Sequence, residues 1–159
     1  MYTSARDLFE SAYDASEDAE RCYNQLMELR HRAMSLGSQS GEARVRSTSD
    51  PGRMAARVGA YVDLERSLDL RMEEDYATIE MANRVLFGED YQSGLLVLVP
   101  KWWVDVLNWR YLMNCKWKFV AHKVHRSERR CRDVAAAAFD VIDGIGIEAV
   151  ARGVGTAED

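Results

Sequence analysis

The sequence predicts an all-α protein with an N-terminal long antiparallel helical hairpin, similar to a coiled coil, and a C-terminal helix-turn-helix domain. Apolar residues recur every three or four positions over the first 36 residues, which is the spacing of helices packed as coiled coils. Only two prolines, Pro51 and Pro100, occur among 159 residues, which favours long helices. Two short amphipathic stretches meet at Ser127, a residue type that can cap the second of two helices.

The first predicted helix follows Thr3 or Ser4, either of which can cap it, and Gly37 can end it. Its apolar seam steps alternately by three and four residues and is rich in alanine, which lets a partner helix come close. The seam residues are Ala5, Leu8, Ala12, Ala15, Ala19, Cys22, Leu26, Leu29, Ala33 and Leu36.

A second long helix is predicted after a polar loop over residues 37–52. Asp50 is a suitable cap, Pro51 suits the first helical position, and Gly88 can end the helix after Phe87. Two long helices joined by one loop form a hairpin whose apolar surface is not fully covered. We therefore interpret residues 1–90 as a dimerisation or docking arm, although the same pattern also fits the scaffold of a compact bundle. The predicted oligomer interface consists of Leu8, Ala12, Ala15, Ala19, Leu26 and Leu29.

The segment before the C-terminal domain is harder to interpret. Residues 95–99, LLVLV, fit a buried helical turn or a strand, and we favour a helix because a lone strand has nothing to pair with. Pro100 can begin a further helix from Lys101 to about Met113. All four tryptophans lie between residues 102 and 117. We expect them in the core of a small domain, and base stacking on exposed indoles is the alternative.

The helix-turn-helix prediction rests on residues 117–143. Trp117, Val120, Ala121 and Val124 form one apolar face, and His125 and Arg126 then interrupt the pattern. After Ser127, the inner face of the second helix is predicted to consist of Cys131, Val134, Ala135 and Ala138. The outward positions are then Glu128, Arg129, Arg130, Arg132 and Asp133.

The same residues carry a resemblance to a known family. Tyr111-Leu112, the Trp117-x-x-Val120-Ala121 helix, Ser127 and the Cys131/Val134 pair resemble the promoter-reading fourth region of sigma-70-type factors. The layout of the chain is similar to phage-encoded sigma-like proteins and to ArpU-type phage transcriptional regulators. The resemblance of motifs covers roughly residues 103–143. His125 stands where such turns often have glycine, and Cys131 stands where isoleucine or leucine is usual.

The resemblance implies binding of duplex DNA, and the distribution of charge favours it. The chain carries a net charge of −5, but residues 115–132 hold seven Lys and Arg against one Glu. Such a local field of one sign attracts a polyanion. We expect Arg129, Arg130 and Arg132 to contact bases or phosphates next to the cap Ser127. The backbone contacts are assigned to Lys116, Lys118, Lys123, His125 and Arg126.

Other classes of function find little support in the sequence. We find no phosphate-binding or nucleophile motif and expect no catalytic residue, no cofactor and no metal site, so the chain is not interpreted as an enzyme. Cys115, His122, His125 and Cys131 lack the spacing of a zinc finger. No apolar run approaches the roughly 20 residues of a membrane span, and the N-terminus lacks the features of a signal peptide. We expect free thiols and a cytoplasmic location in a bacterial host.

The sequence thus predicts an arm at 1–90, a sigma region-4-like domain at 91–145 and a flexible tail at 146–159. We expect a homodimeric, sequence-specific, DNA-binding transcriptional regulator of a phage or prophage. Its mechanism would be positioning on DNA or contact with RNA polymerase. Two alternatives stay open. One is a DNA-packaging adaptor similar to a small terminase subunit, and the other is a protein-binding inhibitor of a mobile element that uses its acidic arm. The sequence gives neither the DNA target nor the sign of regulation.

Overall fold

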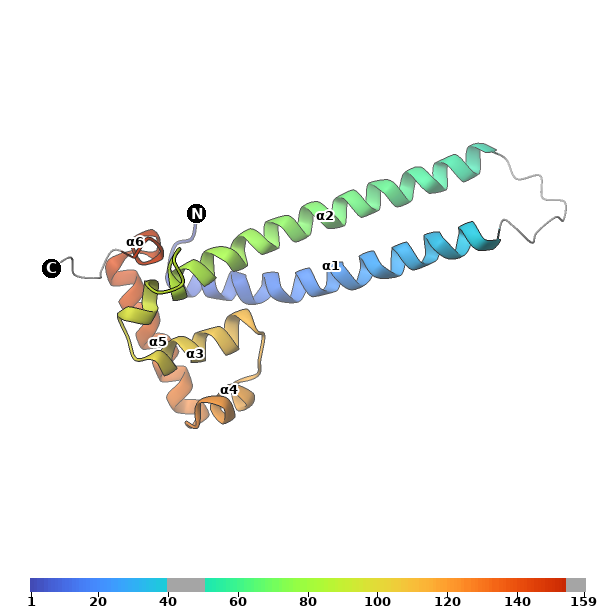
Figure 1. The fold of residues 1–159 in the computed structure, drawn as a ribbon. Helices are drawn as coiled ribbons and strands as arrows, with labels where there is room; N and C mark the ends of the chain where they lie inside the picture. Colours follow the sequence, from blue (N-terminus) through green and yellow to red (C-terminus); the bar gives the residue numbers. More distant parts are fainter. Residues whose placement is uncertain (40–50, 154–159) are drawn as a thin grey trace. The chain divides into compact units, whose positions relative to one another are not determined.

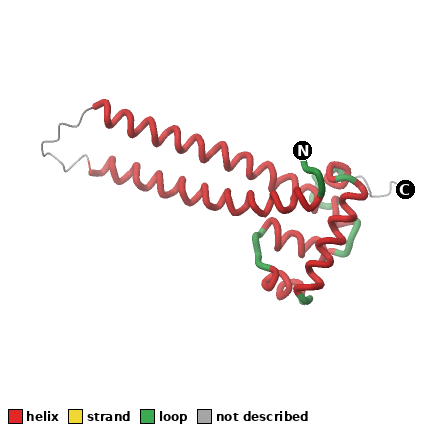
Figure 2. Tube along the Cα trace, turned by 180° about the vertical axis from the view of Figure 1, so that it is seen from behind, coloured by secondary structure: helices red, strands yellow, loops and turns green. Residues whose placement is uncertain are grey.

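The computed structural model describes residues 1–39 and 51–153, and every regular element in that part of the chain is helical, with no strand. This confirms the all-α prediction (Figures 1 and 2). Among the described residues, no helix combines the length and apolar character needed to cross a bilayer. The elements are α1 (Ala5–Gln39), α2 (Pro51–Phe87), the 3-10 turn η1 (Gly94–Val97), α3 (Lys101–Leu107), the π-helical turn η2 (Asn108–Leu112), α4 (Trp117–Val124), α5 (Glu128–Ile145) and α6 (Ile147–Ala151).

The chain forms two compact units. Unit 1 comprises Met1–Glu17 and Asp75–Asp159, and unit 2 comprises Asp18–Glu74. Both long helices therefore contribute residues to each unit. The residues within each unit contact one another more than they contact the other unit. The predicted domain boundaries at residues 90 and 145 stay a prediction.

Helix α1 begins where the sequence indicates. The backbone N–H of Asp7 donates to Oγ of Ser4 at 3.1 Å, so Ser4 caps the helix. The predicted seam is buried from Ala5 to Leu29, whereas Ala33 is exposed. The side chain of Leu36, like the predicted cap Asp50, lies outside what the structure describes. The helix passes through Gly37 and extends to Gln39, so the predicted end was two residues early.

Unit 2 pairs the later turns of α1 with the first turns of α2, which run antiparallel and side by side in Figures 1 and 2. Its buried cluster is small and consists of Cys22, Leu26, Leu68 and Met72. Two interhelical ion pairs accompany the cluster. Nη2 of Arg30 lies 3.0 Å from Oε1 of Glu65, and Nη2 of Arg71 donates to Oδ1 of Asp18 at 2.7 Å. With so few buried side chains, each contributes a large share of the stability of unit 2.

Leu26→Asp is therefore expected to unfold unit 2. The Leu26 side chain is 4% exposed, and a carboxylate there would be buried without a partner. We expect the free energy of unfolding of unit 2 to fall by about 3 kcal/mol or more, measured by hydrogen exchange of its backbone amides. Tyr23→Asp, on the same helix but 51% exposed, is the matched control and should change little. Equal exchange in both variants would disprove the seam assignment.

Two glycines shape the exit from α2. Gly88 has φ +76° and directly follows the helix, as its residue type predicts. Gly94 has φ +69°, and a Cβ there would lie 2.6 Å from the backbone nitrogen of Gly88. Only glycine fits this close approach of two backbone segments. The LLVLV segment that follows starts as the helical turn η1, which confirms the choice of helix over strand.

The core of unit 1 gathers the first turns of α1, the last turns of α2 and the elements from η1 to α6. Phe9 is central to it, with ring centroids 5.8 Å from Tyr111 and 5.5 Å from Phe139. Helices α3, α4 and α5 pack on one another within this unit.

The structure differs from the prediction of a flexible tail over residues 146–159. Residues 147–151 form α6, and its Val150 and Ala151 are buried in the core of unit 1. The prediction of a flexible tail from residue 146 is therefore wrong for these residues. The adjacent side chains of Val150 and Ala151 are buried by other parts of unit 1, and the local sequence does not reveal these contacts. Residues 154–159 lie outside the described residues.

Candidate nucleic-acid interface

The candidate site is the surface of α4, the turn at residues 125–127, and the first turns of α5. The turn begins with His125, whose φ of 55° and ψ of 45° are left-handed. Arg126 follows, and Oγ of Ser127 accepts the backbone N–H of Arg130 at 3.1 Å, so Ser127 caps α5. The predicted interruption after Val124 and the predicted cap Ser127 are confirmed. Histidine thus occupies the left-handed conformation that glycine usually supplies.

His125→Gly is expected to stabilise unit 1 by about 0.5–1 kcal/mol, because a Cβ is strained in the left-handed region. The same exchange at exposed His122, inside α4, should lower stability by about 1 kcal/mol, because glycine is a poor helix former. Chemical denaturation of both variants measures the two shifts. Destabilisation of equal size in both would mean that the turn does not strain His125.

The inner faces of α4 and α5 fix which side chains point outward. Val120 and Ala121 are buried on α4, and the predicted inner face of α5 is buried throughout: Cys131, Val134, Ala135 and Ala138. The predicted contact residues are exposed as a consequence: Lys116, Lys118, Lys123, His125, Arg126, Ser127, Arg129, Arg130 and Arg132. The structure therefore brings these residues onto the surface of one short stretch of two helices.

None of the lysines and arginines between residues 116 and 132 forms an ion pair with a carboxylate of the described residues. Several arginines elsewhere in the chain do, as Arg32 does with Glu28 at 3.1 Å and Arg30 with Glu65 at 3.0 Å. Ion pairing neutralises a charge locally and occupies the N–H groups that would otherwise bind a ligand. The positive charges of the candidate site are thus available to an external anion.

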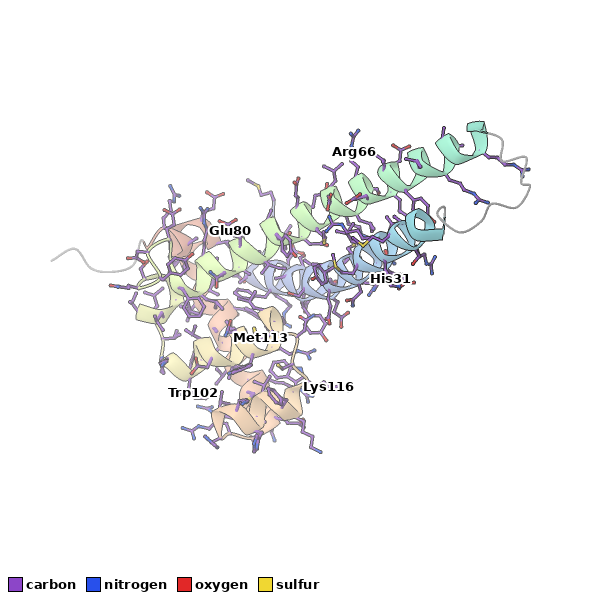
Figure 3. All side chains as sticks on the ribbon, turned by 45° about the vertical axis from the view of Figure 1, so that its right-hand side comes forward. His31, Arg66, Glu80, Trp102, Met113 and Lys116 are labelled. Carbon is purple, nitrogen blue, oxygen red and sulfur yellow. The ribbon has the colours of Figure 1, made fainter. Side chains whose placement is uncertain are left out.

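Aromatic rings hold several of these cations, a feature that sequence reasoning missed. The guanidinium carbons of Arg126 and Arg130 lie 5.1 and 5.9 Å from the ring centroid of Trp102. Nζ of Lys123 lies 5.4 Å from the centroid of Trp109. The tryptophans are half-buried, so they pack on the core, as expected, with faces that also support charged side chains. Figure 3 marks Trp102 on α3 and Lys116 just before α4.

A further stack lies beside α5. The guanidinium carbon of Arg110, in the π-helical turn η2, lies 4.7 Å from the ring centroid of Tyr13 and 5.0 Å from that of Trp117. Arg132 lies 5.6 Å from the centroid of the same Trp117. These residues line a cleft of about 510 Å³ that also holds Glu10 and Asp14. The mixture of acidic and basic side chains makes this cleft less attractive to a polyanion than the exposed cationic surface.

The histidines and cysteines of this region do not form a favourable metal site. Cys131 is fully buried on the inner face of α5, and burial raises the pKa of its thiol. A thiol must ionise to ligate zinc, so a raised pKa opposes ligation. His122 and His125 are exposed, with ring centroids 6.5 Å apart.

The six residues predicted as an oligomer interface lie inside the folded chain. The side chains of Leu8, Ala12, Ala15, Ala19, Leu26 and Leu29 are each at most 8% exposed. A second copy could reach them only if α1 separated from its intrachain neighbours. These residues therefore need no second copy to cover them.

Comparison with known proteins identifies no similar protein. No family model matches the chain, and neither a curated protein nor a solved structure matches it significantly. A helix with exposed, unpaired arginines at its start, held against a second helix by a three-residue turn, can present cations to phosphates and to base edges.

Proposed function

We propose that the chain is a sequence-specific, duplex-DNA-binding transcriptional regulator that acts through α4 and α5. One observation carries the proposal: the cations of residues 116–132 are exposed and lack carboxylate partners among the described residues. The chain as a whole is acidic, with 26 acids against 21 Lys and Arg, so the cations of this stretch form a local cluster of positive charge. Such a cluster attracts a polyanion, and Lys and Arg that neutralise phosphates gain affinity from the release of counterions.

The proposed mechanism places the N-terminal turns of α5 in the major groove, which is wide enough to admit a helix. Arg129 is exposed, and its side chain has no hydrogen bond, ion pair or ring contact within the described part of the chain. Its guanidinium is therefore free to donate two hydrogen bonds to the major-groove edge of a guanine. Lys116, Lys118, Lys123, His125 and Arg126 would hold the phosphates on either side of the groove, and the contacts with Trp102 and Trp109 would limit the entropy lost on binding.

The role in transcription rests on the residues that resemble sigma region four, namely Tyr111-Leu112, Val120-Ala121 and Ser127. By that resemblance the protein would act on promoters of a phage or prophage in the bacterial cytoplasm and could contact RNA polymerase. No segment resembles the part of sigma factors that melts promoters, so we do not propose a complete sigma factor.

Binding to DNA fragments that flank the gene tests this function. Labelled fragments are titrated with the full chain over a salt series, with scrambled duplex as competitor. We expect binding that resists the competitor and weakens steeply as salt rises, because released counterions drive association. Absence of binding even at low salt would refute the proposal.

A second candidate is docking of a protein on unit 2, whose exposed large apolar side chains favour it. Unit 2 exposes Tyr23, Met27, Met34, Val58 and Val62. Because the predicted seam is buried within the chain, a homodimer would need a different surface, and these exposed residues offer one. Sedimentation of the full chain tests the assembly. A dimer suits a regulator, a large ring suits a packaging adaptor, and a monomer leaves this surface to a different protein.

A further inference from the structure

Arg129 and Asp133 occupy one exposed face of α5, at its second and sixth residues. Residues four apart on a helix lie one above the other, about 6 Å apart along its axis. Successive base pairs are about 3.4 Å apart. Two side chains at this spacing can therefore reach base pairs that are at most about two steps from one another.

The two side chains differ from the neighbouring arginines in having no partner. Arg126, Arg130 and Arg132 lie against the rings of Trp102 and Trp117. The side chains of Arg129 and Asp133, by contrast, have no hydrogen bond, ion pair or ring contact with any residue that the structure describes. The cations held against rings are suited to fixed phosphates, and the two free side chains are suited to reading bases.

A carboxylate in a surface that binds phosphates needs a compensating donor, since it would otherwise repel the DNA. Among base edges in the major groove, cytosine offers its N4 amino group as a donor and carries no acceptor of its own there, since the neighbouring O6 belongs to the paired guanine. Guanine and thymine present acceptors, and adenine places its N7 acceptor beside its amino group. A carboxylate acts only as an acceptor when ionised, so cytosine suits it best.

We propose that Asp133 is a specificity-determining residue that accepts a hydrogen bond from a cytosine amino group, within about two base pairs of a guanine read by Arg129. This inference rests on the proposed binding of duplex DNA and adds the base preference of the site. The half-buried alanines that follow, Ala136 and Ala137, leave space for the DNA to approach this face.

Selection from a randomised duplex library tests the inference, with the full-length wild type, Asp133→Asn and Asp140→Asn compared. Asn favours adenine, so Asp133→Asn should replace a cytosine preference of about 10-fold with an adenine preference at that position only. Asp140→Asn removes the same charge from an exposed position about 10 Å further along α5 and should leave the selected sequence unchanged.

The outcomes separate the two proposals. If the wild type selects a sequence and Asp133→Asn selects the same one, the role of Asp133 is refuted while DNA binding stands. A wild-type site that lacks cytosine near the guanine refutes it as well. If the wild type retains no duplex above background, the proposed function itself fails and the base preference falls with it.

Discussion

Replacing Lys118, Arg126 and Arg129 together with alanine is expected to lower affinity for the DNA target by roughly 100-fold or more. Loss of a base-reading arginine alone costs about 1–3 kcal/mol, and each lost phosphate contact adds to this. All three side chains are exposed and have no carboxylate partner in the described part of the chain. The slope of log affinity against log salt should also decrease, by about 0.9 for each phosphate contact removed.

A matched variant separates contact from bulk charge. Arg21, Arg32 and Arg84 are also exposed, each is paired with a carboxylate, and their replacement by alanine removes the same net charge. We expect little loss of affinity and a nearly unchanged salt slope for this control. An equal loss in both variants would show that DNA is attracted only by the total charge of the chain and that α4 and α5 form no specific interface.

Phe9→Ala is expected to produce the largest loss of stability. The Phe9 side chain is fully buried, and its ring packs on Tyr111 of η2 and Phe139 of α5. Removal of a buried phenylalanine leaves a cavity and costs about 3–5 kcal/mol. Because these contacts lie within unit 1, the same loss should loosen the support of the candidate interface. Chemical denaturation measures the free energy of unfolding.

Tyr76→Ala is the control for this prediction. Tyr76 also belongs to unit 1 but is 54% exposed, and replacing an exposed side chain normally changes stability by less than about 0.5 kcal/mol. A loss below about 1 kcal/mol in Phe9→Ala would contradict the assignment of Phe9 to the centre of the core.

Helix positions could be predicted where the signals are local. Ser4 and Ser127 cap their helices, Pro51 begins α2, and Gly88 follows its end, because capping and φ restrictions act over only a few residues. Helix α6 could not be predicted, because its Val150 is buried by residues that are distant in the sequence. Periodicity also could not show that α3 would continue as a π-helical turn.

The candidate site was predictable in its outline and not in its detail. The 3/4 spacing of buried residues on α5 predicted correctly that Arg129, Arg130 and Arg132 would be exposed. The contacts between cations and tryptophan rings were missed, since they depend on how α3 packs against α4 and α5. The nearest signal in the sequence was the crowding of four tryptophans beside the basic residues.

The most direct test of the central claim is an NMR titration of the isotope-labelled chain with its selected duplex. We expect the largest changes in backbone amide shifts in residues 116–133, on α4, the turn and the start of α5. Absence of shifts, or shifts confined to unit 2, would contradict the claim that α4 and α5 form the nucleic-acid interface.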